Sequence, residues 1–146
     1  VEAEVAPDSD EVEGVNDRIQ LARSEAELRR RTAQHWLRQG VTMLDPSRTA
    51  IDATVELAPD VTLFPGTLLQ GRTRVGRGAE IGPDTRLVDC QVGPDAVVQN
   101  TVGSDAEIGE GAVVGPFAVL DAGAHVDAWA RTGPHFHATI EDDGRA

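Results

Sequence analysis

Aliphatic residues recur at every sixth position through the second half of this chain. The series comprises Ile51, Leu57, Leu63, Leu69, Val75, Ile81 and Leu87, and it resumes at Val102, Ile108, Val114, Leu120 and Val126. A small or β-branched residue lies four places after most of these, from Val55 to Ala130. A fixed period of six is typical of the hexapeptide repeats that form a parallel β-helix. The repeat therefore predicts a mainly β solenoid before any single residue suggests a chemistry.

Each six-residue unit is expected to supply one short strand and one tight turn, so that three units complete a triangular coil. The aliphatic residue points inward, and the small residue fits where the interior narrows. Gly-Pro-Asp steps at 82–84 and 93–95 suit the corners, because glycine tolerates a positive φ and aspartate caps its own backbone. One coil cannot bury its apolar edge alone, so stacking on the next coil supplies the core.

The spacing of the repeat changes between Leu87 and Val102. Val92 follows Leu87 by five residues, and Val102 follows ten residues later. We expect a short corner or a small outward bulge there, the simpler interpretation being a tolerated deletion. Cys90 lies in this segment and is expected to be a structural thiol. As the only cysteine it cannot form an internal disulfide, which favours a reducing cytoplasm.

Charge and composition exclude several classes of partner. The formal net charge of −12 argues against binding of nucleic acid and of anionic membrane surfaces. No apolar run reaches the length of a membrane span, and no signal peptide is visible. All 13 basic residues are arginine, and tyrosine is absent as well, so no mechanism that needs a lysine or a tyrosine of this chain is available.

The first forty residues predict an acidic segment followed by a long helix. The helix is expected from Arg18 to Gln39, with Asn16 or Asp17 as its N-cap and Gly40 at its end. Glu25–Arg29 and Glu27–Arg31 are expected ion pairs, since residues four apart are neighbours on a helix. Arg29 to Arg31 could form an anion-binding patch, although a solvated helix face explains them as well. The segment at 40–46 is expected to be a strand that enters a turn.

Several motifs resemble those of the bacterial bifunctional enzyme family that makes UDP-N-acetylglucosamine. They are Gly14-Val15-Asn16, Gly40-Val41-Thr42 with Asp45-Pro46, Pro65-Gly66-Thr67, Ile81 to Thr85 and Gly115-Pro116-Phe117-Ala118. That family joins a uridylyltransferase domain to a glucosamine-1-phosphate acetyltransferase through a helix. The resemblance implies a left-handed parallel β-helix of hexapeptide repeats preceded by a long linker α-helix. It also implies a homotrimer.

The resemblance divides the chain into four parts. Residues 1–16 would be the tail of an upstream nucleotidyltransferase domain, 17–40 the linker helix, 41–137 the β-helix and 138–146 an acidic C-terminal tail. It implies that Asn16 helps to hold Mg²⁺ and the sugar nucleotide, UDP-N-acetylglucosamine or UTP, if an upstream domain is present. A carboxamide oxygen is a suitable ligand for Mg²⁺. A helix N-cap is the structural alternative for Asn16.

The acetyltransferase part of this resemblance is weakened at specific positions. The family carries Leu-Arg-Pro-Gly where this chain has Leu120-Asp121-Ala122-Gly123, so Asp121 replaces an arginine that contacts the sugar phosphate. Thr139 lies near the position of a substrate-binding lysine. The catalytic histidine and the acetyl-CoA coils lie further along the family's sequence, so we expect no acetyl-CoA site and no catalytic residue here.

Three functions follow as hypotheses. The first is a trimerising scaffold within an enzyme of UDP-N-acetylglucosamine biosynthesis, with a degenerate acetyltransferase site. The second is an active acetyltransferase whose site another chain completes. The third is a stand-alone scaffold or metal-binding trimer, since His125, His135 and His137 could hold zinc, although their spacing matches no known signature. Asp84, Asp95 and Asp105 could suggest Ca²⁺, but turn-capping aspartates explain them.

Overall fold

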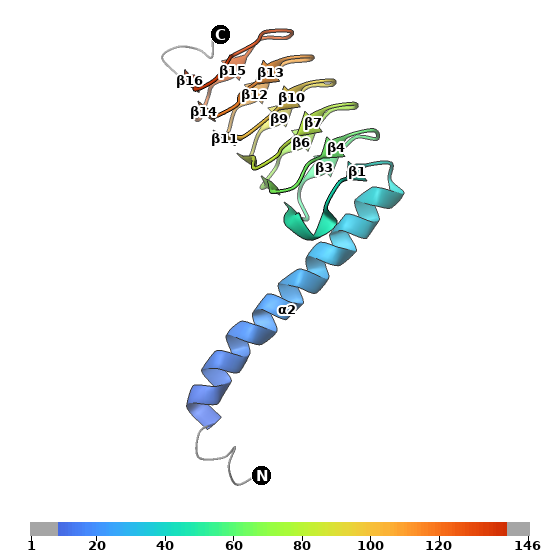
Figure 1. The fold of residues 1–146 in the computed structure, drawn as a ribbon, viewed down its shortest axis with the longest axis vertical. Helices are drawn as coiled ribbons and strands as arrows, with labels where there is room; N and C mark the ends of the chain where they lie inside the picture. Colours follow the sequence, from blue (N-terminus) through green and yellow to red (C-terminus); the bar gives the residue numbers. More distant parts are fainter. Residues whose placement is uncertain (1–8, 140–146) are drawn as a thin grey trace.

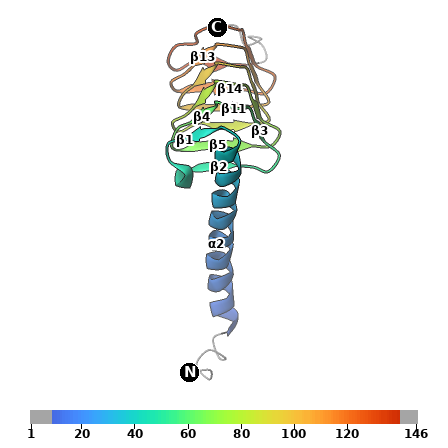
Figure 2. The same ribbon diagram turned by 90° about the vertical axis from the view of Figure 1, so that its right-hand side faces the viewer.

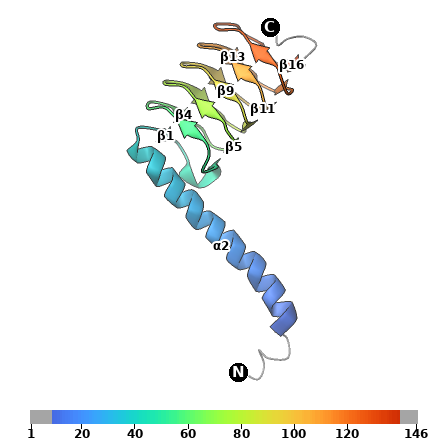
Figure 3. The same ribbon diagram turned by 180° about the vertical axis from the view of Figure 1, so that it is seen from behind.

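Three parallel sheets run along a solenoid that follows a single long helix (Figure 1). The computed structural model describes residues 9–139, with side chains from residue 17 onward. Each sheet takes one strand from every coil, so consecutive strands of the chain belong to different sheets (Figure 3). The fold is the mainly β, parallel β-helix that the six-residue repeat predicts, with about five coils.

The strands of the described chain are short, and each sheet has a regular order. The first sheet contains β1 (Thr42–Met43), β4 (Thr62–Leu63), β7 (Glu80–Ile81), β10 (Val97–Val98) and β13 (Val113–Val114). The second contains β2 (Thr49–Ile51), β5 (Thr67–Gln70), β8 (Arg86–Val88), β11 (Thr101–Ser104), β14 (Ala118–Leu120) and β16 (His137–Ala138). The third contains β3 (Glu56–Leu57), β6 (Arg74–Val75), β9 (Gln91–Val92), β12 (Glu107–Ile108) and β15 (His125–Val126).

The core is a stack of inward aliphatic residues that match the predicted repeat. Ten of the predicted positions are buried: Leu57, Leu63, Leu69, Val75, Ile81, Leu87, Ile108, Val114, Leu120 and Val126. The small residues four places on are buried as well from Val55 to Ala124, while Ala130 is only partly buried. Because every inward side chain lies above its equivalent in the previous coil, the apolar core is continuous along the solenoid.

The second sheet shows where the sequence expectation is wrong. Val102 was expected to point inward, but it is 54% exposed, and the buried residue is Gly103. Gly103 pairs with Leu87 on one side and Leu120 on the other. A Cβ at Gly103 would lie 3.1 Å from Leu87 Cδ2, so the neighbouring leucine fills the space that an aliphatic side chain would occupy.

Shortened corners explain this change of register. Pairing runs from Thr49 to Thr67, eighteen residues on, but from Arg86 to Val102 it spans only sixteen. One residue is missing between Leu87 and Val92, one between Val98 and Gly103, and one between Gly103 and Ile108. The expectation of a short corner is therefore confirmed, whereas counting backwards by six from Ile108 selects the wrong residue.

Helix α2 (Ser9–Arg38) precedes the solenoid and contacts only its beginning (Figure 2). Its backbone passes through residues 16 and 17, so the N-cap expected there is wrong and the helix begins further upstream. Its end is confirmed. Gly40 has φ +94°, and the amides of Gly40 and Val41 donate to Leu37 O and Trp36 O at 3.2 and 3.0 Å, a Schellman cap.

Only the last turns of α2 join the core. Ala33 is 3% exposed and Trp36 is partly buried, whereas Ile19, Leu21, Leu28 and Leu37 are exposed. Strand β1 and the 3-10 helix η2 (Pro46–Arg48) follow, which confirms the expected strand and turn. No helix within residues 9–139 combines the length and apolarity needed to cross a membrane.

Leu68 and Leu69 provide a matched test of this core. Leu69 is fully buried, whereas the adjacent Leu68 faces outward and is partly exposed. We expect Leu69→Ala to lower the free energy of unfolding by about 2–5 kcal/mol, because it leaves a cavity between two coils. Leu68→Ala should lower it by about 1 kcal/mol or less. Urea unfolding measures both, and equal losses would contradict the inward assignment.

Candidate functional site

Asp121 and His137 lie side by side at the end of the second sheet. Strand β14 ends at Leu120 and pairs with β16, where Leu120 is opposite Ala138, and this register brings Asp121 next to His137. His137 Nε2 is 2.8 Å from Asp121 Oδ2, and both side chains are about half exposed. Asp121, which stands where the resemblance implies an arginine, is therefore already in contact with an imidazole.

The three histidines near this end of the chain have separate partners. His125 Nδ1 is 3.3 Å from Glu107 Oε2, and its Nε2 is 3.2 Å from Asp127 Oδ1. His135 stacks on Phe117 with ring centroids 5.4 Å apart. Among residues 9–139, no group of three or more His, Cys, Asp or Glu side chains is arranged to hold a metal ion. The structure thus does not bring the histidines together as the zinc hypothesis requires.

The corner aspartates stabilise turns. Asp84, Asp95 and Asp105 have φ of 47°, 60° and 48°, a left-handed conformation that aspartate tolerates better than most residues. Their amides donate to Pro65 O, Arg77 O and Val88 O in the previous coil at 3.1, 2.9 and 2.8 Å. The turn interpretation is therefore confirmed, and hydrogen bonds from these corners join successive coils.

Other predicted residues have these positions. Asn16 lies within α2, and its side chain is outside the described part, so its role in binding Mg²⁺ and sugar nucleotide stays a prediction. Thr139 directly follows β16. Cys90 is buried, and burial raises the pKa of its thiol, which confirms a structural role for the only cysteine.

Glu27 binds two arginines of the Arg29–Arg31 run. Arg30 Nη2 and Arg31 Nε lie 2.6 and 2.9 Å from Glu27 Oε2. These hydrogen bonds, first that of Arg30 and then that of Arg31, lower the pKa of Glu27 from its ordinary value of 4.5 to about 2. The Glu27–Arg31 pair is confirmed. The expected Glu25–Arg29 pair is absent from the ion pairs of the described residues, and Arg29 faces a groove instead.

Removing an arginine should raise the pKa of Glu27. We expect Arg30→Gln to move it back toward 4.5 by more than Arg31→Gln does, because the Arg30 hydrogen bonds have the larger effect. Since the folded pKa is depressed, these pairs stabilise the helix above about pH 4.5, and the effect is lost as pH falls to about 2. Carboxyl ¹³C titration by NMR measures the pKa. A Glu27 that titrates near 4.5 in the unmodified chain would contradict the geometry.

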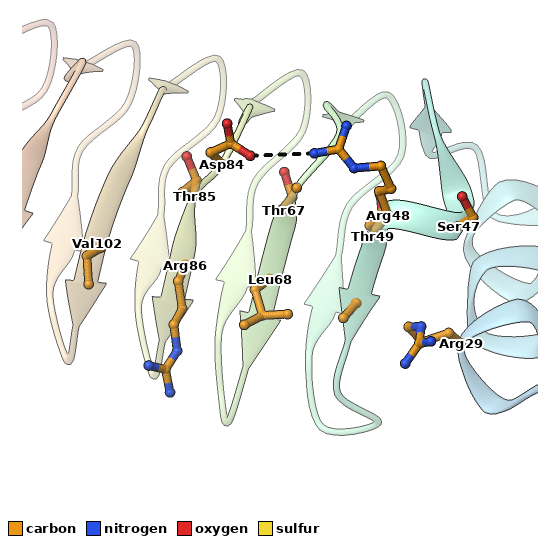
Figure 4. A pocket seen from close by; sticks show the side chains of 12 residues that line it. Arg29, Ser47, Arg48, Thr49, Thr67, Leu68, Asp84, Thr85, Arg86 and Val102 are labelled. Carbon is orange, nitrogen blue, oxygen red and sulfur yellow. Dashed lines mark ion pairs between the residues drawn. The ribbon is translucent and has the colours of Figure 1, made fainter. Parts of the chain in front are cut away.

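An arginine-lined groove, which no motif in the sequence predicts, lies where α2 meets the second sheet. Arg29 of α2, Arg48 of η2 and Arg86 of β8 line it together with Leu68 (Figure 4). Ala50 is another of its lining residues. Its cavity volume is about 430 Å³. The residues are far apart in sequence and meet only through the coiling. One feature of the sequence indicates the groove: an arginine lies among the outward-facing residues of the second sheet, which are otherwise mostly apolar.

Comparisons with known proteins identify close relatives. No family model matches the chain. The bifunctional protein GlmU of Kineococcus radiotolerans is 53% identical over 133 residues, which are 91% of this chain and 27% of that protein. GlmU of Pseudarthrobacter chlorophenolicus is 47% identical over 145 residues, or 99% of this chain and 30% of that protein. The chain thus spans less than a third of the curated relatives that it matches.

Solved structures show a weaker likeness. A variant of perosamine N-acetyltransferase from Caulobacter crescentus, bound to CoA and GDP-perosamine, is 20% identical with a TM-score of 0.39. The match covers 77% of this chain and 59% of that one. A likeness at this level adds nothing to the argument about the site.

Proposed function

Because the chain belongs to the bifunctional GlmU family, whose C-terminal portion it matches, we propose that it is a trimerising β-helix with an inactive acetyltransferase site. It would serve an enzyme of UDP-N-acetylglucosamine biosynthesis as a scaffold. The resemblance adds the homotrimer to this proposal, and the single cysteine favours the cytoplasm. In the intact protein, the sugar nucleotide would bind at the uridylyltransferase domain and not at the β-helix.

The Asp121–His137 pair is the observation that supports an inactive site most directly. Binding of a sugar phosphate requires cationic or neutral hydrogen-bond donors. The resemblance implies that the family uses an arginine and a lysine for this purpose. Asp121 presents a negative carboxylate instead, and His137 already occupies one of its oxygens at 2.8 Å. Thr139 carries no positive charge near the position of the lysine. Repulsion between Asp121 and a phosphate therefore disfavours binding of glucosamine 1-phosphate.

We expect no transfer of an acetyl group from acetyl-CoA to glucosamine 1-phosphate by the purified chain. Release of CoA thiol measures the reaction, and GlmU of Kineococcus radiotolerans serves as the positive control. Asp121→Asn removes the repulsive charge, and it should raise the affinity for glucosamine 1-phosphate without producing turnover. Transfer by the unmodified chain in proportion to its concentration would overturn the proposal and favour an active acetyltransferase.

The homotrimer needs an apolar contact surface, and the second sheet offers one near its C-terminal end. Phe117 and Val119 are 58% and 42% exposed on β14 and the corner before it. Large exposed apolar residues that lie close together are typical of protein–protein contacts. The opposite face of the same strand is buried in the core, so a change at Val119 can alter assembly without opening the fold.

Val119→Glu should weaken the trimer, because it places a charge in an apolar contact. Sedimentation equilibrium measures the mass, and we expect the trimer to dissociate at a protein concentration at least tenfold higher than for the unmodified chain. Because the dissociation constant of a trimer scales with the square of that concentration, the shift is about 2.7 kcal/mol per trimer or more. Val113→Glu is the matched control, since Val113 faces outward from the first sheet. A trimer that Val119→Glu leaves intact would exclude this surface, and a monomeric unmodified chain would exclude the trimer.

The nucleotidyltransferase side of the proposal depends on residues beyond those described. Asn16 would contribute a carboxamide oxygen to Mg²⁺ and to UTP or UDP-N-acetylglucosamine only together with a uridylyltransferase domain. The side chain of Asn16 lies outside the described part of the chain.

A further inference from the structure

The groove between α2 and the second sheet has a charge opposite to that of the chain as a whole. The chain carries a net charge of −12, yet the charged residues that line the groove are Arg29, Arg48, Arg86 and Asp84. Three arginines face a single carboxylate. A local positive charge on an acidic protein attracts anions over the distance of a Debye length.

The hydrogen-bonding capacity of these arginines is largely unused. The side chain of Arg29 has no ion pair or hydrogen bond among the described residues. Arg86 Nε donates to the neutral Gln70 Oε1 at 2.7 Å. Arg48 Nη2 lies 3.8 Å from Asp84 Oδ1, close to the limit of an ion pair. Because each guanidinium has five N–H donors, most of them remain available to a ligand.

The hydroxyl groups in the wall are already engaged. Ser47 Oγ donates to Asp45 Oδ1 at 2.6 Å, and Thr67 Oγ1 donates to Phe64 O at 2.7 Å. Recognition must therefore come from the arginines, which match phosphate oxygens in a bidentate geometry. A ligand with hydroxyl groups alone would find few partners here.

The spacing of the arginines favours an extended ligand with several charges. Ala50, Leu68 and Arg86 are aligned on three adjacent strands, so Arg86 is two strands from Ala50, about 10 Å at the usual strand spacing. Arg29 lies on the helix side of this row, and Figure 4 shows it apart from Arg86, with Leu68 on a strand between them. One phosphate group cannot contact both arginines easily, whereas a compact carbon body with several phosphates can rest on Leu68 and reach both.

We propose that this groove binds a polyphosphorylated small molecule. Arg29 and Arg86 hold phosphates at its two ends, Arg48 provides a third contact, and the ring or carbon body covers Leu68. The proposal does not require acetyltransferase chemistry. The groove borders the proposed trimer surface, because Val102, which lines the groove, pairs with Val119 on the next strand. The oligomeric state is therefore measured together with binding.

Inositol hexakisphosphate is the probe, and isothermal titration calorimetry at low salt measures its binding. We expect Arg29→Gln and Arg86→Gln to weaken binding about three- to fivefold each, the effect of one exposed ion pair. Lysine at either position should retain part of the affinity, since it keeps the charge but loses the bidentate contact. Arg74→Gln is the matched control: it changes the net charge equally, but Arg74 pairs with Glu56 on the third sheet.

The controls separate the groove from general charge attraction. Inorganic phosphate should bind far more weakly, and myo-inositol should not bind. Two results would overturn the proposal. One is an equal loss of affinity for inositol hexakisphosphate in Arg74→Gln and Arg86→Gln, and the other is no binding of inositol hexakisphosphate at millimolar concentration. Sedimentation of the same variants provides a further outcome. If Arg29→Gln changes the oligomeric state and leaves binding intact, the groove is a contact between copies of the chain, and the proposal fails.

Discussion

Stacking of one coil on the next is the interaction on which the whole structure depends. Strands of two to four residues cannot form a stable sheet alone, and each gains its hydrogen bonds only from the coils before and after it. The inward side chains follow the same rule, since Leu69 and Leu87 each cover the equivalent residue of a neighbouring coil. Stability is therefore close to a sum of nearest-neighbour terms, and a local defect affects two interfaces.

The sequence predicts the repetitive part of this structure well because periodicity and burial express the same constraint. An inward aliphatic residue every sixth position leaves little freedom for Leu63, Leu69 or Ile81. The prediction from the six-residue pattern fails at Val102 and Gly103, because no hydropathy pattern marks a glycine as an inward residue. Only the pairing with Leu87 and Leu120 shows why the glycine is accommodated. The beginning of α2 was misplaced for a related reason, since Asn16 and Asp17 satisfy a cap pattern that the helix does not use.

Functional residues were harder to predict, because they belong to different coils. Asp121 was singled out by comparison with a family motif, but its partner His137 follows only from the β14–β16 register. Arg29, Arg48 and Arg86 share no motif, and coiling alone brings them to one groove. In a solenoid, residues about eighteen apart become neighbours on the surface. Motifs that assume contiguous sequence therefore miss sites of this kind.

The junction between α2 and the first coil has a mechanical consequence. The helix has 30 residues, so it is about 45 Å long at 1.5 Å per residue, and only its last turns contact the solenoid. Such a helix would pivot about the contact that Ala33 and Trp36 make with the first coil. The arm from this contact to residue 9 is about 38 Å at 1.5 Å per residue, so a tilt of about 10° would displace the far end by about 7 Å. Small changes in the packing at residues 33–41 therefore control the position of anything joined to the other end of the helix.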